Sequence, residues 1–180
     1  MTGFGYNING FGVSGIVADP GGSVYFEGGS VVQLDNEAVS GNDEWNIGEN
    51  EAFCFEAFIN FDLSNSYNNI FSSWESANDY AGILFHVLSS GKIFVGYDGH
   101  TGTSPESPVV SADTWTHVAV TRNAGSAIKF FIGGTAAGTM TDDSAIGGRP
   151  MYSAANMDSG GLGAYRPTGF ISNGRIVIGE

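Results

Sequence analysis

Glycine frequency is the sequence feature that most restricts how this chain can fold. Of its 180 residues 28 are glycine, and they are spread along the chain without a fixed period. A glycine inside a helix costs roughly 1 kcal/mol relative to alanine, so segments interrupted this often do not form helices of ordinary length. The apolar segments between them are short, rich in Phe, Val, Ile and Tyr, and alternate with small or polar residues. This pattern predicts an all-β sandwich.

Strand and turn signals continue along the chain, and no linker divides it, so we expect a single domain. We expect a glycine-rich segment over residues 1–20 and a β-sandwich over residues 21–180. Hairpins are predicted at Ser89–Gly91 and at Gly133–Gly134, because two glycines suit a turn that needs positive φ. Thr141–Pro167 has few strand signals and is expected to be a surface excursion with at most one short helical turn. The strongest strand signals lie in Ser23–Phe26, Val31–Leu34, Ala52–Phe61, Asn69–Trp74, Gly82–Leu88, Ile93–Tyr97, Thr116–Arg122, Ile128–Ile132, Ala136–Met140 and Ile171–Ile178.

Alternation along the strands predicts which side chains share a sheet face. In Phe53–Phe61 every second residue is apolar, which places Glu56 on the opposite side. The same alternation in the two neighbouring segments places His117 and Arg175 on that polar side. A half-buried carboxylate needs a partner. We therefore expect Glu56 to pair with Arg175 or to accept a hydrogen bond from His117.

Composition excludes several classes of partner. The chain has 19 acidic and 6 basic residues, giving a formal charge of −13. Nucleic acids and anionic membranes attract basic surfaces, so neither is an expected partner. Cys54 is the single cysteine, which excludes an intrachain disulfide and a cysteine-based zinc cluster. The sequence shows neither a signal-peptide pattern nor an apolar run long enough to span a bilayer, so membrane insertion is not expected.

The sequence offers no complete catalytic pattern. A G-x-G-x-x-G match at Gly10–Gly15 lacks the helix that this motif requires, and the S-x-x-K match at Ser89–Lys92 lies in a predicted turn. Glycoside hydrolysis needs two carboxyl groups, and the same-face neighbours of Glu56 on its own strand are Cys54 and Phe58. We expect no enzyme activity. A glycosidase that combines Glu56 with an acid on another strand is the less favoured alternative.

Calcium is the one cofactor for which the sequence offers candidate ligands, and these lie in its acidic segments. Residues 33–39, 41–51 and 139–145 are rich in Asp, Glu and Asn, whose oxygen atoms calcium prefers. None of these segments follows the D-x-[DN]-x-[DN]-G pattern of a calcium loop. Solvated loop tips are the favoured interpretation, and calcium stays open.

Aromatic residues beside polar loops are the better functional signal. Sugar sites combine a flat ring, which covers C–H surface, with amides or carboxylates that bind hydroxyl groups. The equally weighted alternative is that Trp74 and Tyr97 end core strands and pack inward. The candidate carbohydrate-binding residues are Trp74, Asp79, Tyr80, Tyr97, Asp98, His100 and Tyr165.

Several segments in a characteristic order resemble the laminin G-like modules of the concanavalin A-like lectin and glucanase superfamily. They are GGSVYFEGG at 21–29, FCFEAFI at 53–59, ADTWTHVAVTR at 112–122, KFFIGGTAAGT at 129–139 and LGAYRPTGFISNGRIVIGE at 162–180. The segment GFISNGRIV at 169–177 is most similar to modules of phage and virus structural proteins.

This resemblance implies a jelly-roll sandwich of two curved antiparallel sheets, used for carbohydrate or protein recognition and in some branches for glycoside hydrolysis. The chain departs from the family at Phe58, where tryptophan is common, and at Ser172 and Asn173, where many members carry acids. The catalytic acid pattern of the hydrolases is absent. We therefore expect a non-catalytic module that binds a glycan or another cell-surface ligand.

The resemblance also implies a setting for the module. We expect it to be extracellular or on a virion surface, as part of a larger surface or virion structural protein. The alternative function is a structural or oligomerisation domain without a glycan ligand, which contacts copies of itself or neighbouring domains.

Overall fold

The computed structural model describes most of the chain as β-strands and their connections. The described residues are 6–8, 17–19, 22–28, 31–34, 45–74, 82–97, 100–103, 108–147, 151–154, 157–158, 161–162 and 165–179. Residues 6–8, 17–19, 97, 100–103, 157–158 and 161–162 are described by their backbone alone. Among all of these, no helix is long and apolar enough to cross a membrane.

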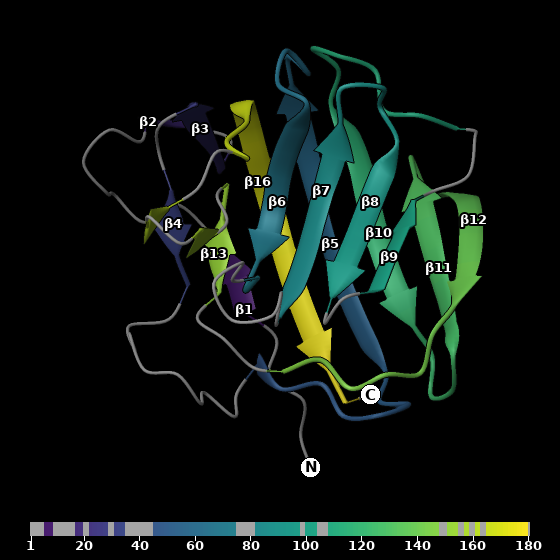
Figure 1. The fold of residues 1–180 in the computed structure, drawn as a ribbon. Coiled ribbons are helices and arrows are strands. Elements are labelled where there is room, and N and C mark those ends of the chain that lie inside the picture. The colour runs from purple at the N-terminus through teal and green to yellow at the C-terminus, as the bar shows by residue number, and fades with distance from the viewer. Residues whose placement is uncertain are drawn as a thin grey trace.

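Two antiparallel sheets lie face to face (Figure 1). The 8-stranded sheet has the order β12-β11-β10-β5-β16-β3-β2, and β1 also pairs with β16. Strands β1 and β2 fall within the expected N-terminal segment, 1–20. The strands of this sheet are β1 (Tyr6–Ile8), β2 (Val17–Asp19), β3 (Ser23–Glu27), β5 (Phe53–Phe61), β10 (Thr116–Arg122), β11 (Ala127–Ile132), β12 (Thr135–Thr141) and β16 (Thr168–Ile178).

The second sheet lies in front of the first in Figure 1. It is 6-stranded, with the order β4-β13-β6-β7-β8-β9, and β14 and β15 form a separate small pair. Its strands are β4 (Val32–Gln33), β6 (Tyr67–Ser72), β7 (Ile83–Leu88), β8 (Ile93–Tyr97), β9 (His100–Thr103) and β13 (Tyr152–Ser153); the small pair is β14 (Met157–Asp158) and β15 (Gly161–Leu162).

The predicted fold class and both predicted hairpins are confirmed. Strands β7 and β8 pair across the turn, where the Gly91 N–H donates to Leu88 O at 2.8 Å. Strands β11 and β12 pair across Gly133 and Gly134, whose φ angles of 58° and 75° are those of the expected primed turn. Every predicted strand segment overlaps a strand, although β6 begins before Asn69 and ends at Ser72, short of Trp74.

The segment Thr141–Pro167 differs from its prediction as a surface excursion. It supplies β13, which lies between β4 and β6 in the second sheet. This strand is only 2 residues long, so its own sequence carries no usable alternation. Pairing holds it in place, since it hydrogen-bonds on both edges and the Ser153 hydroxyl donates to Ile70 O at 2.9 Å. Among the described residues of this segment there is no helical turn.

The core lies between the sheets and follows the predicted alternation. The inward side chains of β5 are only 0–3% exposed; they are Phe53, Phe55, Ala57, Ile59 and Phe61. From the opposite sheet they meet apolar side chains of β6, β7 and β8, and the rings of Phe55 and Phe71 lie 6.4 Å apart between centroids. Alternation on β5 therefore fixes which side chains face outward on the first sheet.

A buried arginine clamps one end of the sandwich. Arg122 is 1% exposed, and its guanidinium donates three hydrogen bonds to backbone oxygens: to Glu51 at 2.8 Å, Ser144 at 2.6 Å and Gly48 at 2.8 Å. The guanidinium carbon also lies 5.1 Å from the centroid of the Phe53 ring. Arg122 thus ties the segment before β5 to the segment after β12.

Candidate functional site

Register on the six-stranded sheet determines which side chains face away from the core. His86 of β7 pairs with Asn69 on β6 and with Phe94 on β8. Its neighbours Phe85 and Val87 belong to the buried core, so His86 and Phe94 lie on the outer face. On β6 the register shifts between Asn69 and Phe71, which returns Phe71 to the core after the extra residue.

Aromatic rings gather on this outer face. The His86 ring stacks on Phe94 at 4.5 Å with an interplanar angle of 9°, and Tyr67 meets His86 edge-on at 5.1 Å. Tyr165 lies 4.5 Å from Tyr67 and 5.9 Å from His86. Trp74 stacks on Tyr165 at 6.5 Å and 23°. We call Tyr67, Trp74, His86, Phe94 and Tyr165 the aromatic cluster.

Backbone hydrogen bonds hold Tyr165 over the sheet. The Asn69 N–H donates to Tyr165 O at 3.1 Å, and the Asn65 side-chain amide donates to Arg166 O at 3.0 Å. These bonds attach residues 165–166 to the β6 side of the sheet. The ring that connects Trp74 to Tyr67 is therefore placed by main-chain contacts as well as by ring packing.

His86 is the polar centre of the aromatic cluster. It is 1% exposed, and neither of its ring nitrogens has a hydrogen-bond partner among the described residues. Burial lowers the pKa of His86 to about 3, so at neutral pH the ring is uncharged. A neutral imidazole has one donor and one acceptor nitrogen. A buried polar group without a partner costs roughly 1–3 kcal/mol, which makes His86 a costly side chain for a purely structural position.

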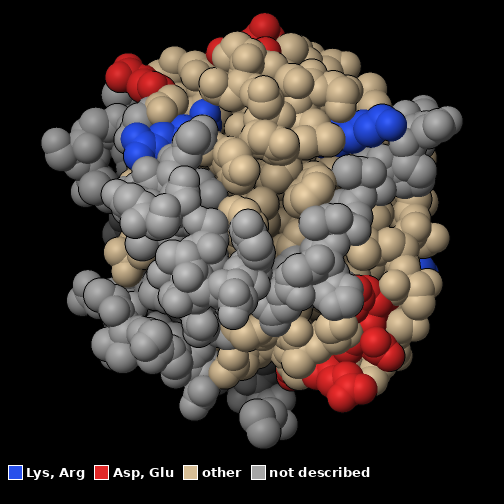
Figure 2. All heavy atoms as spheres, in the orientation of Figure 1, with Lys and Arg blue, Asp and Glu red and all other residues tan. Residues whose placement is uncertain are grey.

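The face in front of the cluster carries little described charge. Figure 2 shows that the described acids and bases seen from this side lie toward its margins, whereas the middle has neither among the described residues. The described rings and the uncharged His86 suit a ligand that has both C–H surface and hydroxyl groups.

The structure brings together two of the residues predicted from sequence. Trp74 and Tyr165 stack in the aromatic cluster. Tyr97 and His100 are cross-strand backbone partners on β8 and β9, and their side chains are not described. Asp79, Tyr80 and Asp98 lie outside the described residues.

Sequence reasoning missed Tyr67, His86 and Phe94. The signal was in the β7–β8 hairpin, because its predicted turn already sets the register that puts His86 opposite Phe94. Tyr67 lay just outside the predicted strand, which began at Asn69, so its face was not assigned.

A second polar group lies on the outer face of the other sheet. Glu56 Oε1 is 3.3 Å from Arg175 Nε, and Glu56 Oε2 is 3.2 Å from His117 Nε2. This confirms the predicted face and the predicted pairing. The register shifts on β16 between Ser172 and Arg175, where Asn173 has φ 49°, and Arg175 comes directly opposite Glu56.

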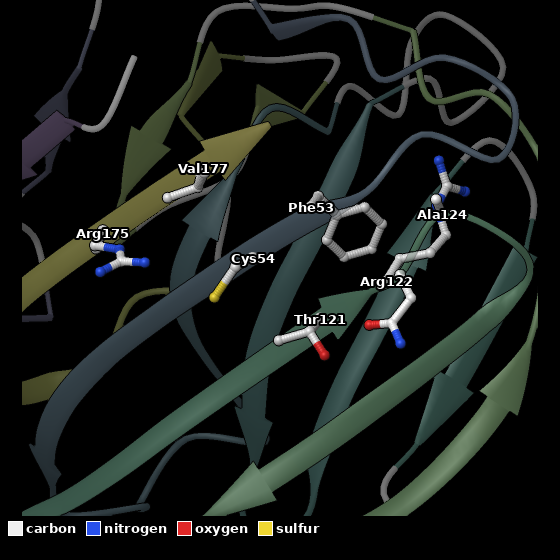
Figure 3. A pocket seen from close by; sticks show the side chains of 8 residues that line it. Phe53, Cys54, Thr121, Arg122, Ala124, Arg175 and Val177 are labelled. Atoms are coloured by element: carbon white, nitrogen blue, oxygen red, sulfur yellow. The ribbon is translucent and has the colours of Figure 1, made fainter. Parts of the chain in front are cut away.

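A shallow cavity of about 350 Å³ lies beside this group (Figure 3). Figure 3 shows Cys54 and Arg175 projecting from the neighbouring strands β5 and β16, with Thr121 on β10. Burial, with a smaller contribution from Glu56, raises the pKa of the Cys54 thiol to about 11, and Arg175 partly offsets this. A protonated thiol is a poor nucleophile and a poor metal ligand, so Cys54 is poorly suited to either role at neutral pH.

Among the described residues, no group of three or more His, Cys, Asp or Glu side chains is placed to hold a metal ion. Residues 35–44, which carry many of the acids that left calcium open, are outside the described part. The calcium hypothesis stays a prediction for that segment.

A family model of the laminin G type, described as the concanavalin A-like lectin/glucanases superfamily, matches residues 26–177. The chain belongs to this superfamily. The family assignment agrees with the two facing antiparallel sheets of the laminin G-like fold. No curated protein matches this laminin G-like chain in sequence.

Solved structures of the same fold include sugar-binding and laminin domains. Domain 4 of the extracellular arabinanase AbnA from Geobacillus stearothermophilus, in complex with arabinotriose, is 16% identical with a TM-score of 0.64, over 97% of this chain and 82% of that one. Mouse laminin α1 domains LG4-5 are 12% identical with a TM-score of 0.60, and the match covers 86% of this chain and 40% of the laminin chain. The Ruminococcus gnavus sialidase module CBM40, bound to α2,3-sialyllactose, is 16% identical with a TM-score of 0.56, over 71% and 74%.

Proposed function

We propose that this laminin G-like chain is a non-catalytic carbohydrate-recognition module that binds a glycan at the aromatic cluster. The observation that carries the proposal is the packing of Tyr67, Phe94 and Tyr165 against the buried, uncharged His86. Trp74 joins this cluster by stacking on Tyr165. Two similar structures contain a bound sugar, arabinotriose in one protein and α2,3-sialyllactose in the other, and this supports a glycan as the ligand class.

The cluster has the two kinds of group that sugar binding needs. Tyr67 is 39% exposed, which leaves ring surface for the C–H side of a sugar. Trp74 is half-buried two residues after the end of β6 and, with Tyr165, extends the ring surface past the strand. The Tyr67 hydroxyl supplies both a hydrogen-bond donor and an acceptor for the ligand.

The setting of the module is part of the proposal. We place it in a larger extracellular protein, with a virion surface as the specific case favoured by the likeness of residues 169–177 to phage and virus modules. Its similar structures are parts of larger proteins: one is domain 4 of an arabinanase, and another is a pair of laminin domains.

The Glu56 group supports recognition rather than hydrolysis. A glycosidase needs a second carboxyl group within about 5–10 Å of the first. The outward cross-strand partners of Glu56 are Ala119 and Arg175, and its outward neighbours on β5 are Cys54 and Phe58. None of these is an acid. If sugar is released from a β-glucan in the presence of the protein, we therefore expect the rate of release to be the same for Glu56→Gln and the wild type.

A glycan array followed by calorimetry tests the binding site. Arabinotriose and 3′-sialyllactose are included as probes, each titrated with calcium and with a chelator. Tyr67→Ala and Trp74→Ala are expected to weaken binding at least about tenfold, which corresponds to about 1.4 kcal/mol. Phe131→Ala removes a half-buried ring from the other sheet and is the matched control.

The outcomes separate the candidate functions. Binding that is lost in Trp74→Ala and kept in Phe131→Ala supports the aromatic cluster. Absence of binding to every glycan removes the lectin function, and a stable oligomer by light scattering would then favour the structural alternative.

A further inference from the structure

Aromatic side chains also gather on the outer face of the eight-stranded sheet. Phe170 of β16 pairs with Tyr25 on β3 and with Asn60 on β5. The Phe170 ring lies 4.8 Å from Tyr25 and 6.0 Å from Trp115, the residue just before β10. Three separate parts of the chain therefore contribute one continuous row of rings.

A second row of rings lies next to the first. Phe58 is the outward residue two positions before Asn60 on β5, and it pairs with His117 on β10. The Phe58 and His117 rings are 5.0 Å apart between centroids. We call Tyr25, Phe58, Trp115, His117 and Phe170 the aromatic platform.

The aromatic platform is exposed to solvent. Trp115 is 46% exposed and Phe58 is 43% exposed, and they are two of the four large exposed hydrophobic residues in the described part of the chain. Scattered exposed apolar residues are ordinary, but here each exposed ring packs against another ring, Trp115 against Phe170 and Phe58 against His117. Exposed apolar patches of this kind commonly mark a binding surface.

Polar groups border the rings on the side of Glu56. His117 belongs to the platform and also contacts Glu56, which in turn pairs with Arg175. Arg175 is 57% exposed at its side chain, so its remaining donors face solvent. The outward residues between the rings are short and polar: Asn60 on β5 and Ser172 on β16. Rings and hydrogen-bonding side chains thus alternate, without an aliphatic side chain between them.

We propose that the aromatic platform is a second carbohydrate-binding surface, which takes a neutral polysaccharide chain lying across β3, β16 and β5. The rings cover the C–H faces of successive sugars, and Asn60, Glu56 and Arg175 bind hydroxyl groups. A neutral chain is favoured over an acidic one because Arg175 and His117 already face the Glu56 carboxylate. The sheet surface at the rings suits a chain that lies along it rather than an end group in a pocket.

This surface is independent of the aromatic cluster, although the ligand class rests on the proposed function. The cluster lies on the outer face of one sheet and the platform on the outer face of the other, with the buried core between them. One polysaccharide can bind the aromatic cluster of one protein molecule and the aromatic platform of another, or it can wrap around a single molecule and bind both. A polymer that engages two sites at once binds more tightly than it would at either site alone.

Affinity electrophoresis separates the two surfaces. The full chain and its variants are run in native gels that contain arabinan, mixed-linkage β-glucan or xylan, with polygalacturonate as the acidic comparison. The variants are Trp115→Ala and Phe58→Ala on the platform, Trp74→Ala on the cluster, and each platform change combined with Trp74→Ala. Val109→Ala removes another exposed apolar side chain, 42% exposed, and is the control.

We expect at least one neutral polysaccharide to retard the wild-type protein. Trp115→Ala and Phe58→Ala should each lower the affinity at least about fivefold. The same decrease should be seen when each is combined with Trp74→Ala. Val109→Ala should leave the affinity unchanged. Unchanged retardation in Trp115→Ala, absence of retardation in every gel, or preference for polygalacturonate would each overturn the proposal. A dimer that Trp115→Ala dissociates, seen by light scattering, would also overturn it by assigning the platform to a protein interface.

Failure of the platform and failure of the proposed function give different results. The first leaves the Trp115 variants indistinguishable from wild type on polysaccharide. The second leaves Tyr67→Ala and Trp74→Ala unchanged in calorimetry with short oligosaccharides. Circular dichroism and urea unfolding of each variant check the fold, and substitutions at exposed positions such as these usually change stability by only about 0.5 kcal/mol.

Discussion

Removing the Arg122 side chain should destabilise the sandwich more than any substitution on its outer faces. The guanidinium donates to three backbone oxygens, those of Gly48, Glu51 and Ser144. In Arg122→Ala these oxygens lose their shared donor, and a cavity remains where the largest fully buried side chain of the described residues stood. The segment before β5 would then lose its tie to the segment after β12.

The size of the loss follows from the contacts. Hydrogen bonds to charged groups contribute about 1.5–3 kcal/mol each to the free energy of unfolding. With three of them broken, Arg122→Ala should lower that free energy by at least about 4 kcal/mol, which for a domain of this size lowers Tm by roughly 8–16 °C. Arg122→Lys should lose less, because an ammonium group keeps the charge and some of the donors but cannot fork to three oxygens.

Urea unfolding followed by tryptophan fluorescence measures this loss, with the midpoint and the slope fitted for each variant. Arg175→Ala is the matched control: it removes an arginine from the same sheet whose side chain is 57% exposed, and it should lose only about 1 kcal/mol or less. A loss below about 1.5 kcal/mol in Arg122→Ala, or a loss equal to that of Arg175→Ala, would refute the clamp.

Three further predictions concern single side chains. The unfolded chain protonates His86 near pH 6.5, whereas burial lowers the pKa of the folded His86 to about 3; the free energy of unfolding should therefore fall on acidification between these values, by up to about 1.4 kcal/mol per pH unit. His86→Phe should lack this pH-dependent part of the free energy of unfolding. If the variant and the wild type lost the same free energy of unfolding between pH 7 and pH 5, the prediction would be contradicted. Because burial raises the pKa of Cys54 to about 11, iodoacetamide at pH 8 should alkylate the native thiol far more slowly than the thiol in urea, and Glu56→Gln should speed the native reaction; equal rates in buffer and urea would count against this. Gly134 has φ 75° and open space around its Cβ position, so Gly134→Ala should lose about 1 kcal/mol in thermal unfolding and Gly134→Asn less; equal losses would show that conformation is not the cause.

Local alternation was sufficient to predict one sheet face from sequence. On β5 the inward and outward residues differ so clearly that Glu56 could be assigned to the outer face without a structure. The same rule on β10 and β16 brought His117 and Arg175 to that face, and their contacts with Glu56 in the structure confirm it. Each of these strands is long enough to carry several alternations, and a one-residue error would have exposed a row of core residues.

Short strands were not predictable in the same way. Strand β13 is 2 residues long, and its place between β4 and β6 depends on partners more than 70 positions away in the chain, such as Ser72 opposite Tyr152. The free energy that selects its conformation comes from pairing and burial after the sheet has formed. A window of sequence around β13 contains none of that information.

The candidate site was predicted in part for a related reason. Trp74 and Tyr165 were identified because they are aromatic residues in polar surroundings, and they do stack. Their contact could not be derived, because it depends on the backbone bond between Asn69 and Tyr165 that attaches residues 165–166 to the β6 side of the sheet. His86 carried no motif, and its significance comes from burial without a hydrogen-bond partner in the described structure.

The aromatic platform shows how much a broken pattern can indicate. In Phe53–Phe61 the outward residues are Cys54, Glu56, Phe58 and Asn60, and Phe58 is the one large apolar side chain among them. Alternation favours a polar residue there, so the exposed ring opposes the simplest pattern for a half-solvated strand. Sequences depart from their own folding pattern mainly where function requires it. One such departure is weak, but cross-strand register places Phe58 beside His117 and brings Phe170, Tyr25 and Trp115 to the same end of the sheet. Departures on separate strands that converge on one exposed surface are better explained by a shared ligand than by independent chance, which is why the platform is worth testing apart from the cluster.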